Sequence, residues 1–333
     1  MSISIVKAGL LTTIQDYGRY GYQKYGVVVS GAMDTYAMRL ANILVGNDEN
    51  EGTLEITIIG PQLKIEKGNL ISITGADISP TINGIKVPMG RPVYINEDSI
   101  LKFGTCLCGC RAYLAVAGGF DIPKIMESKS TYIRGKIGGK EGRQLKDGDE
   151  IDICEKNELS EKIILKLSEN RSIKSFTYPK WYVKSFMTSN LRDNVIRVLP
   201  DRQFENVSKK SLADFFDSEF VIDSKSDRMG YRLKGPKIEF KEDIEMISGE
   251  VSFGTIQIPP DGNPIILLAD RATAGGYPKI AHIVNEDFYK IVQLKALEKV
   301  RFEKITFEEA EDMYLKREEY IEELKKSIKL ISL

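Results

Sequence analysis

Between residues 54 and 103, apolar residues form short runs that begin about ten positions apart and are separated by turns containing glycine. Runs of this length, rich in isoleucine and valine, are typical of β-strands rather than helices. Asn83-Gly84 lies between two such runs and is a strong signal for a two-residue hairpin turn. Another run follows at residues 111–117. Many short strands at even spacing predict an all-β sandwich or barrel.

Helical spacing occurs in two other places. Apolar residues recur every third or fourth position at residues 37–44, where Asp34 can cap the segment and Gly46 can end it. We therefore expect a helix at 34–46, inserted among the strands. The end of the chain shows the same spacing after a capping-box sequence, which predicts an amphipathic helix at 307–331.

The most informative stretch is residues 256–279, IQIPPDGNPIILLADRATAGGYPK. Its apolar run at 265–269 is bounded by proline and glycine turns, as expected of a buried strand. Asp270, Arg271 and Thr273 follow directly. A rigid strand that ends at the surface holds such groups where ligands can reach them, which favours a binding site. An ordinary β-turn with a surface Asp–Arg pair explains the same residues about equally well.

The pattern Arg-x-Gly-Tyr-x-x-x-Gly occurs at residues 19–26 and again at 228–235. Each copy has an aspartate nearby, Asp16 in the first case, and each precedes residues that we expect to be strands. Two copies predict a tandem duplication of one β-rich unit. Related units usually pack about a pseudo-two-fold axis, so Arg19 and Arg228 would converge on a shared groove. Alternatively, each motif is a turn that holds its own half of the fold.

These patterns predict a mainly β protein made of two tandem β-barrel units with a few helices. Two domains are also the default for a chain of 333 residues. The expected parts are a first barrel unit at 1–155 with the inserted helix, a linker or peripheral segment at 156–190, a second barrel unit at 191–306, and the C-terminal helix.

The composition is that of an ordinary soluble protein, with 42% apolar and 29% charged residues. Net charge is −1 and the basic residues are spread along the chain, which argues against nucleic-acid binding. No apolar run is long enough to cross a membrane, and the N-terminus lacks the pattern of a secretory signal. We therefore expect a cytoplasmic protein without a membrane partner.

Histidine and cysteine chemistry is limited. His282 is the only histidine and lies in an apolar setting, so we favour a half-buried strand residue over a catalytic one. Cys106, Cys108 and Cys110 alternate along one expected strand, and we favour a small-residue face over a metal site. Sites with several histidines are excluded, and no metal site is predicted.

Four segments together resemble one family closely: residues 12–34, 111–123, 226–236 and 254–281. The family is the C subunit of bacterial 5-oxoprolinase, also called KipA or allophanate hydrolase subunit 2, which is similar to the carboxyltransferase part of urea carboxylase. The resemblance implies barrels of the cyclophilin-like kind and two partners, a KipI-like B subunit of the same enzyme and its A subunit. One departure is Lys129, where the family usually has arginine.

The resemblance implies ATP-dependent opening of 5-oxo-L-proline to L-glutamate, with ATP and Mg²⁺ used by the complex. A lactam is a poor electrophile, so phosphorylation of its amide oxygen would activate the carbon for attack by water. Two alternatives stay open. One is a biotin-dependent carboxyltransferase acting on urea or a similar amide, with biotin supplied by another carrier. The other is a non-catalytic regulatory protein that binds KipI.

Phosphoryl activation requires cations for anionic groups and a carboxylate base. We expect catalytic roles for Asp16, Asp34, Asp270 and Arg271, with the aspartates as bases or orienting groups. We expect contacts to substrate or phosphate from Arg19, Arg228, Gln257, Thr273, Tyr277 and Lys279. Which protein of the complex holds ATP, the stoichiometry and the activity of the isolated chain are open at this level.

Overall fold

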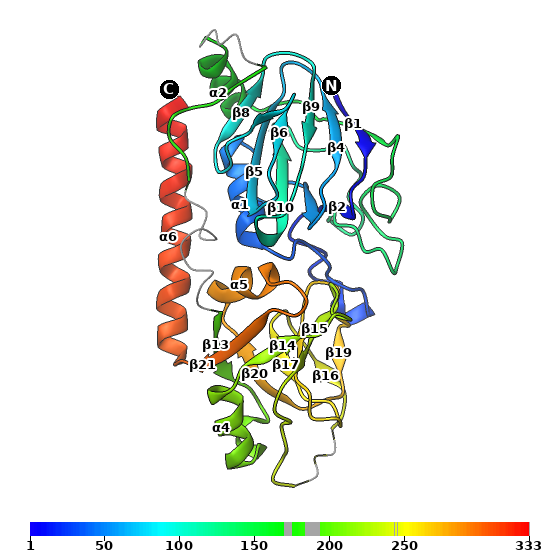
Figure 1. The fold of residues 1–333 in the computed structure, drawn as a ribbon, viewed down its shortest axis with the longest axis vertical. Helices are drawn as coiled ribbons and strands as arrows, with labels where there is room; N and C mark the ends of the chain where they lie inside the picture. Colours follow the sequence, from blue (N-terminus) through cyan, green and yellow to red (C-terminus); the bar gives the residue numbers. More distant parts are fainter. Residues whose placement is uncertain (170–174, 184–193, 243, 245, 333) are drawn as a thin grey trace. The chain divides into compact units, whose positions relative to one another are not determined.

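The computed structural model describes residues 1–169, 175–183, 194–242, 244 and 246–332. Chain contacts divide it into two compact units. The first unit contains residues 1–18, 34–190 and 321–333, and the second contains residues 19–33 and 191–320 (Figure 1).

The first unit contains two six-stranded antiparallel sheets (Figure 1). One sheet runs β11 (Glu150–Asp152), β1 (Ser2–Lys7), β4 (Gln62–Ile65), β9 (Ser99–Lys102), β6 (Thr81–Ile82) and β7 (Ile85–Lys86). The other runs β12 (Phe176–Thr177), β8 (Pro92–Ile95), β5 (Leu70–Asp77), β10 (Cys108–Val116), β3 (Thr53–Thr57) and β2 (Leu11–Gln15).

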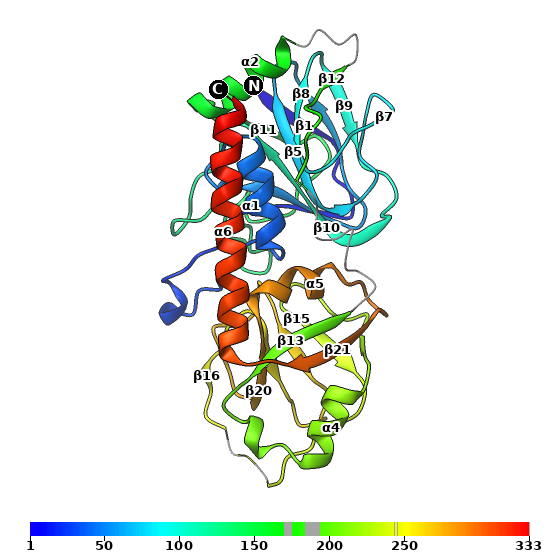
Figure 2. The same ribbon diagram turned by 90° about the vertical axis from the view of Figure 1, so that its left-hand side faces the viewer.

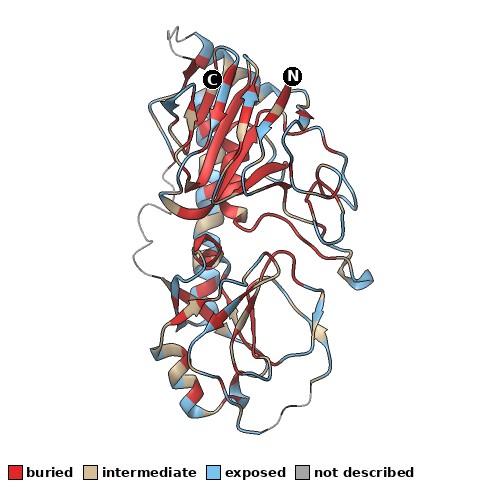
Figure 3. Cartoon of the chain, turned by 45° about the vertical axis from the view of Figure 1, so that its right-hand side comes forward, coloured by how far each residue is buried: buried red, intermediate tan, exposed pale blue. Residues whose placement is uncertain are grey.

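The two sheets share one apolar core, to which strands of both contribute fully buried residues such as Ile3, Ile56 and Leu101. Figure 3 shows these strands as the most continuous buried part of the unit. The predicted hairpin is present: β6 and β7 are joined by Asn83 and Gly84, which both have positive φ. That conformation is the one that a two-residue hairpin of this kind requires.

Helix α1 (Thr35–Leu44) covers the outer face of the second sheet, against β5 and β10 (Figure 2). It begins as predicted, because the Asp34 carboxylate accepts a hydrogen bond from the Ala37 N–H. It also ends as predicted, before Gly46 with φ 82°. The Thr74 hydroxyl on β5 donates to the Ala37 carbonyl and fastens the helix to the sheet.

The segment at 156–190, expected to be a linker or peripheral segment, contains the unforeseen helix α2 (Glu158–Ser168) and the edge strand β12. Asn157 caps this helix by accepting from the Ser160 N–H. Ser160, Ile163 and Leu167 form its buried face, which is a helical spacing that the many charged neighbours obscure in the sequence. Residues 170–174 and 184–190 of that prediction lie outside the described residues.

The second unit is a closed seven-stranded barrel (Figure 1). Its strands follow the order β13 (Val195–Pro200), β20 (Lys279–Ile283), β17 (Thr255–Gln257), β18 (Ile265–Leu267), β15 (Gly230–Lys234), β14 (Phe220–Ile222) and β21 (Lys299–Lys304). A separate ribbon pairs β16 (Gly249–Glu250) with β19 (Ala274–Gly275). The remaining short elements are η1 (Gln23–Tyr25), η2 (Phe204–Asn206), α4 (Lys209–Asp217), η3 (Asn285–Asp287) and α5 (Phe288–Gln293).

Helix α6 (Phe307–Ser332) closes the chain and is the long helix of Figure 2. It starts with the predicted capping box, in which the Thr306 N–H donates to the Glu309 carboxylate and the Glu309 N–H donates to the Thr306 hydroxyl. Its residues up to Tyr320 belong to the second unit and the rest to the first.

The mainly β fold is therefore confirmed, with a closed barrel in the second unit and two sheets in the first. The two Arg-x-Gly-Tyr copies, however, differ in local structure. Residues 230–234 form strand β15, whereas the first copy leads into the short η1 helix and residues 27–33 contain no strand. The strand expected after the first copy is wrong. The pseudo-two-fold relation between the units stays a prediction.

Candidate functional site

Most of the predicted site residues belong to the second unit. That unit contains Arg19, Arg228, Gln257, Asp270, Arg271, Thr273, Tyr277 and Lys279, and the first unit contains Asp16 and Asp34.

Asp270 and Arg228 form a buried ion pair where β18 ends. Arg228 Nε lies 3.0 Å from Asp270 Oδ2, and Nη2 lies 3.1 Å from Oδ1, so the contact is bidentate. The same carboxylate accepts from the Ser30 hydroxyl at 2.7 Å, and Arg228 Nη2 donates to the Gly31 carbonyl at 2.6 Å. Ser30 and Gly31 both have positive φ, which is a costly conformation for serine. The pair therefore holds this turn in place.

Arg271, the next residue, has quite different surroundings. Its guanidinium is buried and donates only to backbone carbonyls, those of Val251 at 3.4 Å and Leu268 at 3.2 Å. Within the described part of the chain, no carboxylate lies within ion-pair distance of it. Burial lowers the pKa of Arg271, with Tyr20 and Asp270 acting in the opposite direction. A buried arginine without a carboxylate is a favourable contact for an anion.

A β-bulge places a second cation near it. Strands β17 and β20 pair Thr255 with His282 and Ile256 with Ala281, but Gln257 pairs with Lys279, so one residue of β20 is skipped. Because paired residues share a face of the sheet, the bulge brings Lys279 to the same face as Gln257, Thr255 and His282.

This polar face lies opposite Ile256 and Ala281, which are fully buried in the barrel core. We call its four residues, Thr255, Gln257, Lys279 and His282, the polar face of β17–β20.

The ribbon β16–β19 lies along this face. The Gln257 amide donates to the Tyr277 carbonyl at 3.2 Å and packs against Gly275, which has no side chain to displace it. Lys279 is buried, and its Nζ lies against Gly249, the partner of Gly275. In the described residues this ammonium has no hydrogen bond or ion pair. Lys279 contacts the ribbon at residue 249, and Arg271 contacts its extension at residue 251. Two positions along a strand correspond to roughly 7 Å.

His282 completes the cluster. Its Nδ1 lies 3.5 Å from the Ser252 hydroxyl, which is 3.2 Å from the Thr255 hydroxyl. Burial lowers the pKa of His282, the Asp201 carboxylate opposes this, and the charge of Arg271 adds to the lowering. The imidazole is therefore neutral near pH 7. Its contact Ser252 is the chain neighbour of Val251, whose carbonyl accepts from Arg271, so the imidazole lies on the Arg271 side of the cluster and is an available proton acceptor.

Three predicted residues have less direct roles. Thr273 is half-buried and contributes its carbonyl, which accepts from the Val251 N–H at 3.4 Å. Tyr277 is 44% exposed beside the ribbon. The Arg19 side chain is only 1% exposed, and its backbone N–H donates to the Val29 carbonyl.

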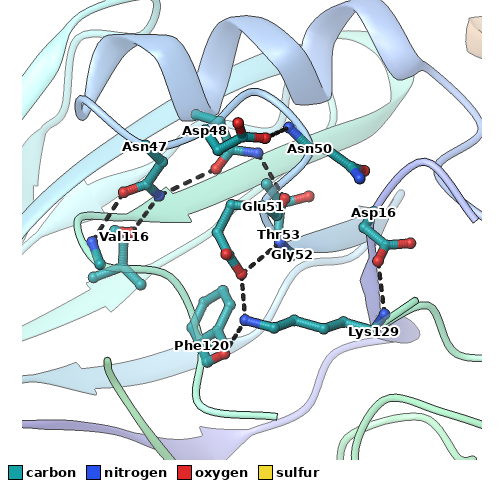
Figure 4. Close-up of polar contacts among 12 residues, drawn as sticks. Asp16, Asn47, Asp48, Asn50, Glu51, Gly52, Thr53, Val116, Phe120 and Lys129 are labelled. Atoms are coloured by element: carbon teal, nitrogen blue, oxygen red, sulfur yellow. Dashed lines mark hydrogen bonds and ion pairs between the residues drawn. The ribbon is translucent and has the colours of Figure 1, made fainter. Parts of the chain in front are cut away.

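In the first unit, Asp16 fastens a loop. Its carboxylate accepts from the Ser128 and Ser130 hydroxyls and from the Lys129 N–H. The Lys129 ammonium donates to the Phe120 carbonyl at 2.8 Å and pairs with the Glu51 carboxylate (Figure 4). The Lys129 ammonium is thus already engaged in an ion pair within the first unit.

Asp34, the other first-unit residue, has the capping contact already described. Its backbone N–H also donates to the Tyr113 hydroxyl at 2.7 Å, and that hydroxyl donates to Glu55. Burial, followed by the nearby Glu55 and Asp34 charges, raises the pKa of Tyr113.

The sequence-based reasoning missed Ser252 and undervalued His282. Simple alternation along β20 would set Lys279 and His282 on opposite faces, and no residue pattern announced the bulge that unites them. Of the three clustered cysteines, only Cys108 and Cys110 lie on β10, and none of the four cysteines, all of which the structure describes, is in a disulfide. Among the described residues, no group of His, Cys, Asp or Glu could hold a metal ion, and no helix could span a membrane.

The chain is similar to proteins of known name. A family model described as carboxyltransferase domain, subdomain A and B, matches residues 25–304. The 5-oxoprolinase C subunit of Haemophilus influenzae is 34% identical over 326 residues, which is 98% of each chain. That of Escherichia coli is 34% identical over 97% of each.

Among solved structures, the urea amidolyase of Kluyveromyces lactis superposes on 97% of this chain with a TM-score of 0.84 and 27% identity. The chain spans 20% of that longer protein.

Proposed function

The chain belongs to the carboxyltransferase domain family, and from this we propose that it is the C subunit of an ATP-dependent 5-oxoprolinase complex, which opens 5-oxo-L-proline to L-glutamate. The observation that carries the proposal is the end-to-end match to two proteins named as this part of 5-oxoprolinase. The match to the amidolyase, by contrast, covers one fifth of a longer protein.

The chemistry of the polar face supports this assignment. Ring opening involves the carboxylate of 5-oxoproline and, in the ATP-dependent route, a phosphoryl group on the amide oxygen. Arg271 and Lys279 are buried cations with no carboxylate partner among the described residues, and they contact one stretch of chain about two residues apart. Two cations so placed suit two anionic groups. Gln257 can orient a polar group between them.

Of the base and orienting roles expected for Asp16, Asp34 and Asp270, their contacts fit the orienting role better. Each carboxylate accepts hydrogen bonds from serine hydroxyls, backbone N–H groups or an arginine that hold a loop, helix or turn. These contacts occupy the carboxylate oxygens and fasten the segment that each aspartate holds.

The proposal carries further components. A KipI-like B subunit, together with the enzyme's A subunit, would complete the complex in the cytoplasm. ATP with Mg²⁺ would supply the phosphoryl group, and in this chain Arg271 and Lys279 are the residues suited to phosphate oxygens.

The test is turnover of the reconstituted complex with Arg271→Ala or Lys279→Ala, measured as 5-oxoproline-dependent ATP hydrolysis and glutamate release. A charged hydrogen bond contributes about 1.5–3 kcal/mol, so we expect kcat/KM to fall by a factor of about 10 to 100. Arg232→Ala is the matched control, because Arg232 is an exposed arginine on β15 of the same unit. Full activity of the Arg271 variant would remove the proposed site.

A second candidate is a biotin-dependent carboxyltransferase, favoured by the family description itself. It predicts turnover of urea or a related amide that depends on a biotinylated carrier protein. Assays with and without such a carrier, using 5-oxoproline and urea in parallel, distinguish the two functions.

A further inference from the structure

The polar face of β17–β20 contains, besides Lys279, a second basic group, His282, for which the sequence patterns indicated no functional role. His282 shares the face with Lys279 through the bulge, and its imidazole lies close enough to Arg271 to be influenced by that charge. We propose that Arg271 and this face together form an anion site that responds to protons: binding of an anion at Arg271 and Lys279 makes His282 take up a proton.

The geometry supports the coupling in two ways. First, Nδ1 of His282 faces the Ser252 hydroxyl, which can donate or accept, so this contact survives protonation of the ring. Second, Nε2 has no hydrogen-bond partner in the described residues and is free to gain a proton. The ring edge packs against Phe288, which fixes its orientation.

The charges around the imidazole set the direction of the effect. Without ligand, burial and the Arg271 cation disfavour the imidazolium, and only the Asp201 carboxylate favours it. An anion bound between Arg271 and Lys279 neutralises the unfavourable charge and adds a favourable one. The pKa of His282 must therefore rise on binding, and by linkage the anion must bind more tightly as the pH falls.

The expected ligand class is a compact dianion or a molecule with two anionic groups, such as a phosphorylated carboxylic acid. The inference deepens the proposed function, on which it rests only for the natural identity of the anion. Inorganic sulfate is the appropriate probe, because its charge does not change over the pH range in which histidine titrates.

His282 is the only histidine, so the ring protons of the untagged full-length chain give a single NMR titration curve. We expect sulfate to raise the measured pKa by about one pH unit, which corresponds to about tenfold tighter binding below that pKa than above it. Sodium chloride at equal ionic strength is the salt control and should have a much smaller effect.

Variants test where the anion sits. Lys279→Met and Arg271→Ala should each remove most of the sulfate effect. Lys86→Gln should keep it, because this residue is an exposed lysine on β7 of the first unit. The proposal is overturned if sulfate leaves the pKa unchanged, if chloride acts equally, or if the effect persists in both site variants.

The NMR result is independent of turnover. A sulfate-dependent pKa in a chain that gives no 5-oxoprolinase activity would keep the anion site and reject the proposed function. The reverse result would reject the coupling alone.

Discussion

The ion pair between Asp270 and Arg228 gives the sharpest test of how the second unit is held together. Its side chains are 10% and 8% exposed, so removing one partner leaves the other charge buried. Such a change typically costs about 3–5 kcal/mol. Asp270→Asn keeps one acceptor oxygen and should cost about 3 kcal/mol, and Arg228→Gln, which also loses the Gly31 contact, should cost at least as much.

The double variant separates this explanation from a general sensitivity of the turn. With both charges gone, no unpaired ion remains, so the combined cost should be close to that of one single variant, a coupling of about 3 kcal/mol. Urea denaturation followed by circular dichroism measures these values. Trp181, the only tryptophan, belongs to the first unit and reports on that unit separately.

If each single variant costs less than about 1 kcal/mol and the two costs simply add in the double variant, the explanation by an unpaired buried charge is refuted. Loss of turnover in Asp270→Asn with unchanged stability would instead make Asp270 the base.

Three further predictions concern other positions. Gly119→Ala should cost about 2 kcal/mol in urea denaturation, because a Cβ there would lie 2.4 Å from Glu51 Cγ at a φ of 75°. Asp34→Ala should cost about 1 kcal/mol in thermal denaturation, since it removes a helix cap. Burial opposes ionisation of Asp287, but hydrogen bonds from Arg197 outweigh it and lower its pKa. Its contribution to stability is therefore present above the unfolded pKa and lost as pH falls below about 4, a loss that Asp287→Asn should abolish in a pH series.

Features governed by local rules could be predicted from the sequence. The cap at Asp34, the Asn83-Gly84 hairpin and the Thr306 capping box each depend on residues at most four positions apart, and all three are present. Strand-rich composition likewise predicted the β class. Helix α2 was missed because its charged residues masked a three-residue buried face.

Roles that depend on partners far along the chain could not be predicted. The sequence shows that Asp270 and Arg271 are neighbours, but only the fold shows that Asp270 pairs with Arg228, 42 positions away, while Arg271 has no carboxylate partner among the described residues. Similarly, the sequence left a base and an orienting role open for Asp16, whose carboxylate is bound by residues 112 to 114 positions along the chain. When loops bring a carboxylate and its partners together, no fixed spacing in the sequence predicts the contact.

The polar face of β17–β20 shows why irregular structure matters most for the site. In a regular strand, Lys279 would share a face with Ala281 and Ile283, which are fully buried in the barrel core, and an ammonium there would be very costly. The single skipped residue turns Lys279 outward to the face of His282, while Ala281 and Ile283 keep their places in the core. One local irregularity thus removes an electrostatic penalty from the core and brings a second cation near Arg271. It follows that the anion site and the packing of the barrel depend on the same bulge.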